Sequence, residues 1–132
     1  MLDVILRVYG EEFDMASFLS QHQNLIVADS FNKGEHDMFG NPNPFSGFDV
    51  IVAESETAEN CIQRIQQFLE MKQQALNFLK ANEVTCVLDI DVTIGSVDEM
   101  PTPLNLSPQL LGDLHQLNIA IEFSAYPHTK GV

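Results

Sequence analysis

Alternating apolar and polar positions predict three strands along the chain. In residues 85–94 every even-numbered residue is apolar, and most odd-numbered ones are polar. Residues 2–9 alternate in the same way, and residues 119–126 repeat the pattern with Phe123 on the apolar side and Glu122 on the polar side. This period of two is typical of strands that have one buried side and one solvent-facing side.

A second spacing, with apolar residues every three or four positions, predicts a helix over residues 57–82. Ser55 or Thr57 can accept hydrogen bonds from the first free amides of this helix. We expect shorter helices over residues 14–21 and after Ser107, which is followed by a proline that suits the first helical turn. The helical content is thus dominated by one long amphipathic element.

The remaining segments complete the predicted fold. We expect strands at 24–30 and 48–52, separated by a loop at 32–47 that contains several glycines and prolines, and a proline-rich loop at 100–103. Because the strands are half polar, they do not resemble a parallel sheet covered on both faces. The sequence therefore predicts one α+β domain over residues 1–132. In it, one long helix and one or two short helices pack on one face of a mainly antiparallel sheet.

Acidic residues dominate the composition, with 19 Asp and Glu against six Lys and Arg, and the formal net charge is −13. Nucleic acids and anionic membranes are therefore poor partners, because both require a cationic surface. No apolar run approaches the roughly 18 residues of a membrane span, and no basic-then-apolar leader begins the chain. Cys61 and Cys86 occupy apolar positions, which predicts buried free thiols and a cytoplasmic location.

The negative charge avoids the predicted long helix. Residues 1–56 contain ten acids and two bases, residues 57–82 two acids and three bases, and residues 83–132 seven acids and one base. If the helix covers one face of the sheet, the opposite face presents a set of acids: Asp3, Asp49, Asp89, Asp91 and Glu122. We call this surface the open acidic face and predict that it binds a partner. The alternatives are a solvated face with scattered acids, some paired with Arg7, and acidity that only confers solubility.

Motifs for catalysis or cofactor binding are absent from the sequence. It contains no Gly-Xaa-Ser-Xaa-Gly elbow, phosphate loop, dinucleotide fingerprint or His-Glu-Xaa-Xaa-His motif. Asp89 and Asp91 lie on one side of a strand, roughly 7 Å apart, and need further ligands to bind a cation, so we favour solvated carboxylates. Glu35, His36 and Asp37 match no known metal-binding spacing and favour a surface loop. We therefore expect no cofactor, no metal and no catalytic residues.

Short motifs at both ends of the chain resemble those of a known family. In residues 4–14, Val-Ile-Leu-Arg-Val-Tyr-Gly-Glu-Glu-Phe-Asp combines a strand ending in Tyr-Gly with an acidic, helix-starting stretch. In residues 104–126, Leu-Ser-Pro-Gln-Leu-Leu opens a short helix, and a final strand ends near a tyrosine. Residues 32–35 supply an Asn-Lys-Gly-Glu turn. Together these segments resemble DUF4279, a bacterial family of unknown function, and the resemblance implies a fold but no activity.

These observations favour a non-catalytic acidic protein that binds a basic protein partner. The specific hypothesis is a cytoplasmic immunity protein that neutralises a cationic toxin domain such as a nuclease, since complementary charge speeds capture. One alternative is a bacterial housekeeping protein with a small-ligand pocket or an unrecognised active site near the loop at 32–47. Another is an oligomer-forming structural protein. The sequence leaves the strand order and the oligomeric state open.

Overall fold

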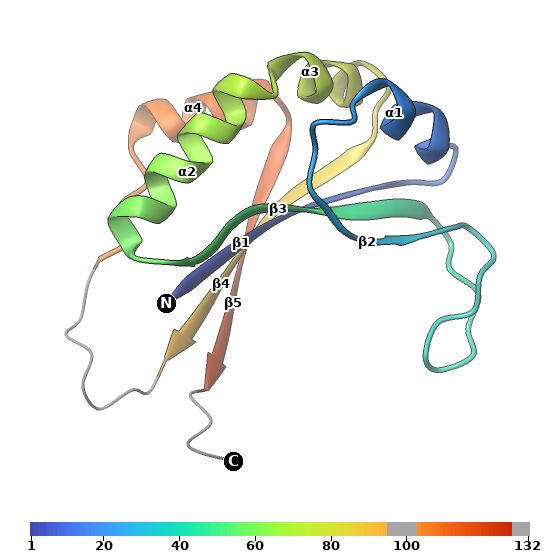
Figure 1. The fold of residues 1–132 in the computed structure, drawn as a ribbon, viewed down its shortest axis with the longest axis horizontal. Coiled ribbons are helices and arrows are strands. Elements are labelled where there is room, and N and C mark those ends of the chain that lie inside the picture. The colour runs from blue at the N-terminus through green and yellow to red at the C-terminus, as the bar shows by residue number, and fades with distance from the viewer. Residues whose placement is uncertain (95–102, 128–132) are drawn as a thin grey trace.

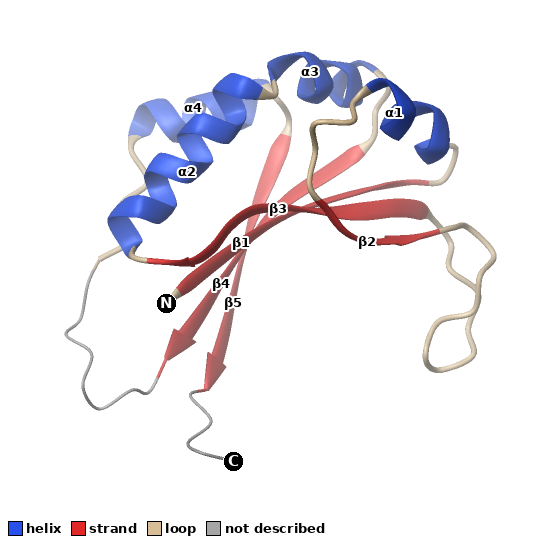
Figure 2. Cartoon of the chain, in the orientation of Figure 1, coloured by secondary structure: helices blue, strands red, loops and turns tan. Residues whose placement is uncertain are grey.

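The computed structural model describes residues 1–94 and 103–127, so most of the expected proline-rich loop at 100–103 lies outside the described residues. Within these ranges the chain forms five strands and four helices (Figure 1, Figure 2). The strands are β1 (Leu2–Gly10), β2 (Val27–Phe31), β3 (Ser46–Glu56), β4 (Thr85–Ile94) and β5 (Ile119–Pro127). The helices are α1 (Met15–Gln21), α2 (Ala58–Met71), α3 (Gln73–Ala81) and α4 (Pro108–Gln116). The α+β class is confirmed.

The strands form one sheet in the order β2-β3-β1-β4-β5. β1 pairs antiparallel with both β3 and β4, and β2 pairs antiparallel with β3. β5 pairs parallel with β4, so the sheet is mixed and the mainly antiparallel prediction holds only in part. The chain enters β5 through α4, and a helical crossover is the usual connection between parallel strands. β5 lies at the edge of the sheet and is mostly exposed, which explains its polar residues. Its polar pattern therefore does not indicate whether it runs parallel or antiparallel to β4.

The helices all lie on one side of the sheet (Figure 1). The apolar side of each central strand faces them, which confirms the alternation predicted for β1 and for the first half of β4. The core consists of these strand residues and the apolar sides of the helices, and its most completely buried members include Val4, Leu6, Val8, Phe18, Phe48, Val50, Ile65, Leu79, Leu88, Ile90, Leu110 and Leu114. The opposite side of the sheet has no helical cover in this view.

The long helix predicted over residues 57–82 is two helices. α2 ends at Met71, and Lys72 leaves helical geometry at φ −110° and ψ 22° before α3 begins. The Lys72 ammonium donates a hydrogen bond of 2.9 Å to the backbone carbonyl of Asn24. The break involves no proline or glycine, and the apolar spacing continues through it, so the sequence gives no sign of it. The N-terminal cap is as predicted, because the Thr57 hydroxyl accepts a hydrogen bond from the Asn60 amide at 3.3 Å.

Two apolar side chains that the alternation placed inward are exposed, and so is one on α4. Phe123 is 56% exposed and Ile94 is 50% exposed, because the carboxyl ends of β4 and β5 extend past the helices (Figure 1). Leu111 on α4 is 44% exposed, whereas Leu110 and Leu114 on the same helix are buried. The helical cover is therefore shorter than the strands beneath it.

Both cysteines are buried and free, as predicted. Burial raises the pKa of the Cys86 thiol to about 12, and burial together with the nearby Glu56 and Asp3 carboxylates raises the pKa of Cys61. A thiol with a raised pKa is a poor nucleophile because the thiolate is the reactive form. None of the helices in residues 1–94 and 103–127 is both long and apolar enough to cross a membrane.

Candidate functional site

The strand register brings the five predicted acids onto one face of the sheet, away from the helices: Asp3, Asp49, Asp89, Asp91 and Glu122. Side chains of directly paired residues point to the same side of a sheet. Arg7 lies opposite Asp49 on the neighbouring strand and therefore shares this face. Asp29 on β2 also pairs with Asp49 and adds a sixth acid that the sequence analysis missed. At least six acids of the described residues therefore share this face with Arg7.

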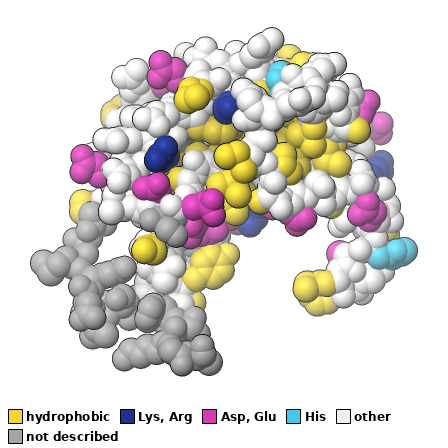
Figure 3. Space-filling view, in the orientation of Figure 1, with side chains coloured by type: hydrophobic (Ala, Val, Ile, Leu, Met, Phe, Trp, Pro, Cys, Tyr) yellow, Lys and Arg dark blue, Asp and Glu magenta, His cyan; other side chains and the backbone are white. Residues whose placement is uncertain are grey.

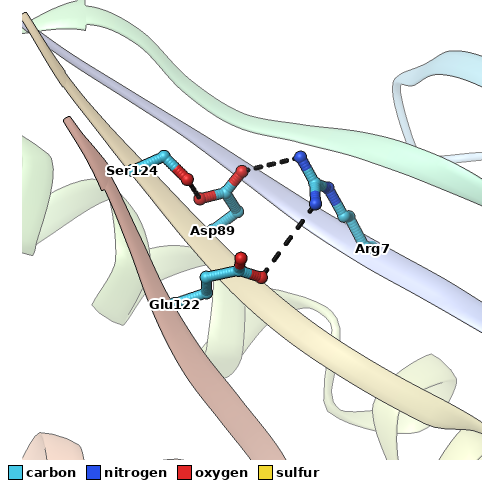
Figure 4. A network of polar contacts seen from close by, with 4 residues as sticks. All are labelled: Arg7, Asp89, Glu122 and Ser124. Atoms are coloured by element: carbon cyan, nitrogen blue, oxygen red, sulfur yellow. Dashed lines mark hydrogen bonds and ion pairs between the residues drawn. The ribbon is translucent and has the colours of Figure 1, made fainter. Parts of the chain in front are cut away.

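Asp89 lies between Arg7 and Ser124 on the open acidic face (Figure 4). An Arg7 nitrogen, Nη2, lies 2.9 Å from its Oδ2 atom, and the Ser124 hydroxyl donates a hydrogen bond of 3.0 Å to its Oδ1 atom. A second Arg7 nitrogen lies 4.0 Å from a Glu122 carboxylate oxygen. Arg7 thus links β1 to the two strands beyond it and joins the acids of β4 and β5.

The expectation that Asp89 is solvated is wrong, because its side chain is 0% exposed. Asp89 lies on β4, between β1 and β5, and is paired with Ile5 and Glu122. Arg7 and Ser124, from the two flanking strands, contact its carboxylate. A buried carboxylate needs a cation and hydrogen bonds, and Arg7 and Ser124 supply them.

Asp91 is coupled to Asp89 on the same strand. The pKa of Asp91 is raised to about 6, chiefly by burial; the Asp89 charge and a hydrogen bond shared with Asp89 contribute to this rise, and Arg7 opposes it. The Oδ1 atom of Asp91 and the Oδ2 atom of Asp89 are buried and make no hydrogen bond of standard geometry with described residues. A proton on Asp91 supplies the missing donor between the two carboxyl groups. Below about pH 6 the pair therefore holds one shared proton in place of two full charges.

The other acids differ in how far solvent reaches them. Glu122 and Asp29 are exposed, whereas Asp3 and Asp49 are half-buried. Burial raises the pKa of Asp49, and the Asp29 and Asp89 charges add to this rise while Arg7 opposes it. The more accessible acids thus surround Asp89, which is more deeply buried than any of them. A cation approaching this face meets the surrounding carboxylates first.

A long loop borders the face. Residues 32–45 connect β2 to β3 and project from the sheet on the side away from the helices (Figure 1). Figure 3 shows the molecule hollowed beneath the sheet, between this loop and the ends of β4 and β5. At the loop tip, Met38 is 89% exposed and Phe39 is 81% exposed. The tip is ordered, because the Asp37 carboxylate accepts hydrogen bonds from the Phe39 amide at 2.9 Å and the Asn41 amide at 3.0 Å.

The polar group Glu35, His36 and Asp37 belongs to the structure of this loop. The Glu35 carboxylate accepts a hydrogen bond from Asn32 at 2.6 Å, and Asp37 is engaged at the tip. His36 forms an isolated bridge with Pro42 across the loop. In residues 1–94 and 103–127 no three His, Cys, Asp or Glu side chains come together as a metal site. The loop is therefore a hydrogen-bonded projection with an apolar tip.

The fold and this face define a class: a small α+β protein whose helices cover one side of a mixed sheet and whose acids occupy the other. The chain belongs to the DUF4279 family, described as a domain of unknown function, whose family model matches residues 1–128. This match confirms the resemblance seen at both ends of the sequence. No curated protein and no solved structure matches the chain.

Proposed function

We propose that the chain is a cytoplasmic, non-catalytic binding protein whose open acidic face receives a basic protein partner. The observation that carries the proposal is the arrangement of charge: among the described residues, at least six acids share the uncovered face with Arg7. Arg7 pairs with the buried Asp89 at 2.9 Å and lies 4.0 Å from Glu122, and this single cation leaves the group of acids with a net negative charge. The hollow beneath the sheet gives this partner a concave surface to enter (Figure 3).

The exposed loop tip adds a second type of contact. Met38 and Phe39 project from an ordered loop beside the acids. Large apolar side chains held in fixed positions are typical anchors of protein interfaces, because little conformational freedom is lost when they bind. Charge around the hollow would attract and orient the partner, and the loop tip would then hold it.

Within this class we favour an immunity protein that neutralises a cationic toxin domain such as a nuclease. A nuclease surface that binds phosphates is basic, and clustered carboxylates can occupy such a surface in place of nucleic acid. We expect the reading frame directly upstream to encode a secreted protein with a toxic C-terminal domain. Excess chain should abolish the activity of that domain.

A matched pair of charge variants tests the proposal. Asp49→Asn with Glu122→Gln removes two charges from the open acidic face, and Glu59→Gln with Glu70→Gln removes two exposed charges from α2. Asp89 is left intact because its loss would disturb the Arg7 pair. Both variants and the wild type would be titrated with the purified C-terminal domain at low and high salt.

The face variant should weaken binding about tenfold, or ~1.4 kcal/mol, at low salt, with an effect that shrinks as salt rises. The α2 variant should bind like the wild type. Equal weakening by both variants would show that only net charge matters and would refute docking at the face. Tight binding without inhibition would refute the immunity role while leaving the docking site intact.

A further inference from the structure

A cavity of about 490 Å³ lies outside the open acidic face, where β1 ends and β4 begins. Its walls come from the turn between β1 and α1, from the first residues of α1, and from the turn between α3 and β4. Phe45, from the end of the loop before β3, closes one side. The volume is within the range of about 300–1,000 Å³ typical of small-molecule sites.

Four phenylalanines contribute to the cavity wall. Phe13, Phe18, Phe45 and Phe78 all line it. The Phe18 ring centroid lies 5.8 Å from that of Phe13 and 5.7 Å from that of Phe78, so these three rings pack as one group. Phe78 is 40% exposed although it sits beside the core, so part of its ring is open to solvent. Exposed ring faces attract cations through the negative potential of the π system.

The cavity rim is acidic. Glu11, Glu12, Asp14 and Glu83 line it, all four are exposed, and no Lys, Arg or His is among the lining residues. Asp14 accepts a hydrogen bond from the Ser17 amide at 3.2 Å as the cap of α1. The three glutamates form no ion pair with a described residue. The C-terminal end of α3 also borders the cavity, and its helix dipole adds negative potential.

We propose that this cavity binds a small organic cation with an apolar body, such as a quaternary or alkyl ammonium compound. The rings suit the apolar groups around a soft charge, and the glutamates supply the opposite charge. A phosphate or carboxylate ligand would be repelled, because every charged side chain in the lining is acidic. A hard divalent cation needs several converging oxygen ligands, and in the described part of the chain the rim carboxylates do not come together as such a group. The site is independent of the proposed docking face.

The sharpest probe is a pair of ligands that differ only in charge. Choline carries a trimethylammonium group, and 3,3-dimethyl-1-butanol has carbon in place of its nitrogen. Each would be titrated into ¹⁵N-labelled protein at low salt while amide shifts are recorded. Choline should shift amides in residues 10–18 and 78–85, and the neutral compound should bind about tenfold more weakly, since the cation–π attraction is lost.

Substitutions in the cavity show which side chains contribute to choline binding. Phe78→Leu keeps an apolar side chain but removes the ring, and should weaken choline binding about fivefold or more. Glu11→Gln with Glu12→Gln should weaken it about threefold at low salt, whereas Glu59→Gln with Glu70→Gln should leave it unchanged. Because the two rim glutamates are exposed turn residues, this double variant tests the cavity even if Phe78→Leu fails to fold.

Three results would overturn the proposal. The first is equal binding of choline and its neutral counterpart. The second is a set of choline-induced shifts centred on the strands around Arg7, which would show general attraction to acidic surfaces. The third is binding here of a lysine-containing peptide but not of choline, which would make the cavity part of a protein interface. None of these results bears on whether the sheet face binds a basic domain.

Discussion

Asp91→Asn should stabilise the protein at neutral pH, although it removes a charged residue from an acidic surface. The two carboxyl groups of Asp89 and Asp91 share one strand, and each has a buried oxygen that lacks a hydrogen bond of standard geometry with a described residue. When Asp91 is protonated, it can donate to Asp89. An asparagine amide can donate in the same way at every pH, so the variant imitates the protonated state permanently.

The magnitude follows from the raised pKa of Asp91. A rise from 3.8 to about 6 means that the folded protein binds the proton more tightly than the unfolded chain. The pair therefore contributes stability that is fully present below pH ~4 and is lost as pH rises through ~6. The full rise corresponds to about 3 kcal/mol. Because Asp91 is only half-buried, we expect about 1–2 kcal/mol.

Urea unfolding between pH 4 and pH 8 measures this difference. The free energy of unfolding of Asp91→Asn, relative to wild type, should increase by about 1–2 kcal/mol across that range, with most of the change between pH 4 and pH 7. Glu59→Gln serves as a control for the loss of one exposed acid and should show no comparable dependence. A variant less stable than wild type at pH 8 would refute the shared-proton arrangement, because it would show that the ionised Asp91 stabilises the fold.

Three further predictions concern the surroundings of this pair and the core. Arg7→Met should lower the free energy of unfolding by about 3 kcal/mol at pH 8, because it leaves the buried Asp89 charge without its cation; adding Asp89→Asn should restore part of this loss, and no restoration would argue against the pair. Gly47→Ala should cost about 3 kcal/mol in urea unfolding, because an added Cβ would lie 2.2 Å from a backbone oxygen of β1; unchanged stability would show that the strands separate easily there. Cys61 and Cys86 should resist a thiol-specific reagent in the folded protein at pH 8 and react fully in urea, since both are buried, and rapid reaction of the folded protein would contradict their burial.

The sequence was sufficient for the features that depend on local patterns. Alternation identified β1 and β4, and the apolar face of α2 and α3 was recognised correctly. Asp14 and Ser107 cap α1 and α4 as their positions predicted. These features are encoded by residues close together along the chain, which is why a single sequence reveals them.

Features that depend on distant parts of the chain were missed. The break at Lys72 has no local signal, and its ammonium bonds to Asn24, 48 residues away. The parallel direction of β5 cannot be deduced from alternation, because an edge strand alternates in either direction. The burial of Asp89 requires the register of β1 and β5 beside β4, which brings Arg7 and Ser124 to its carboxylate. The sequence indicated the face on which Asp89 lies but not its depth.

The central claim is that negative potential is concentrated on the uncovered face of the sheet and draws a basic partner there. The electrostatic potential near each amide proton can be measured with two nitroxide probes, one cationic and one anionic, added separately. Each probe enhances the paramagnetic relaxation of the amide protons that it approaches. The ratio of the two effects reports the local potential. We predict more negative values at the strand amides around Asp49 and Glu122 than along α2. A uniform potential, or one most negative over α2, would contradict the account.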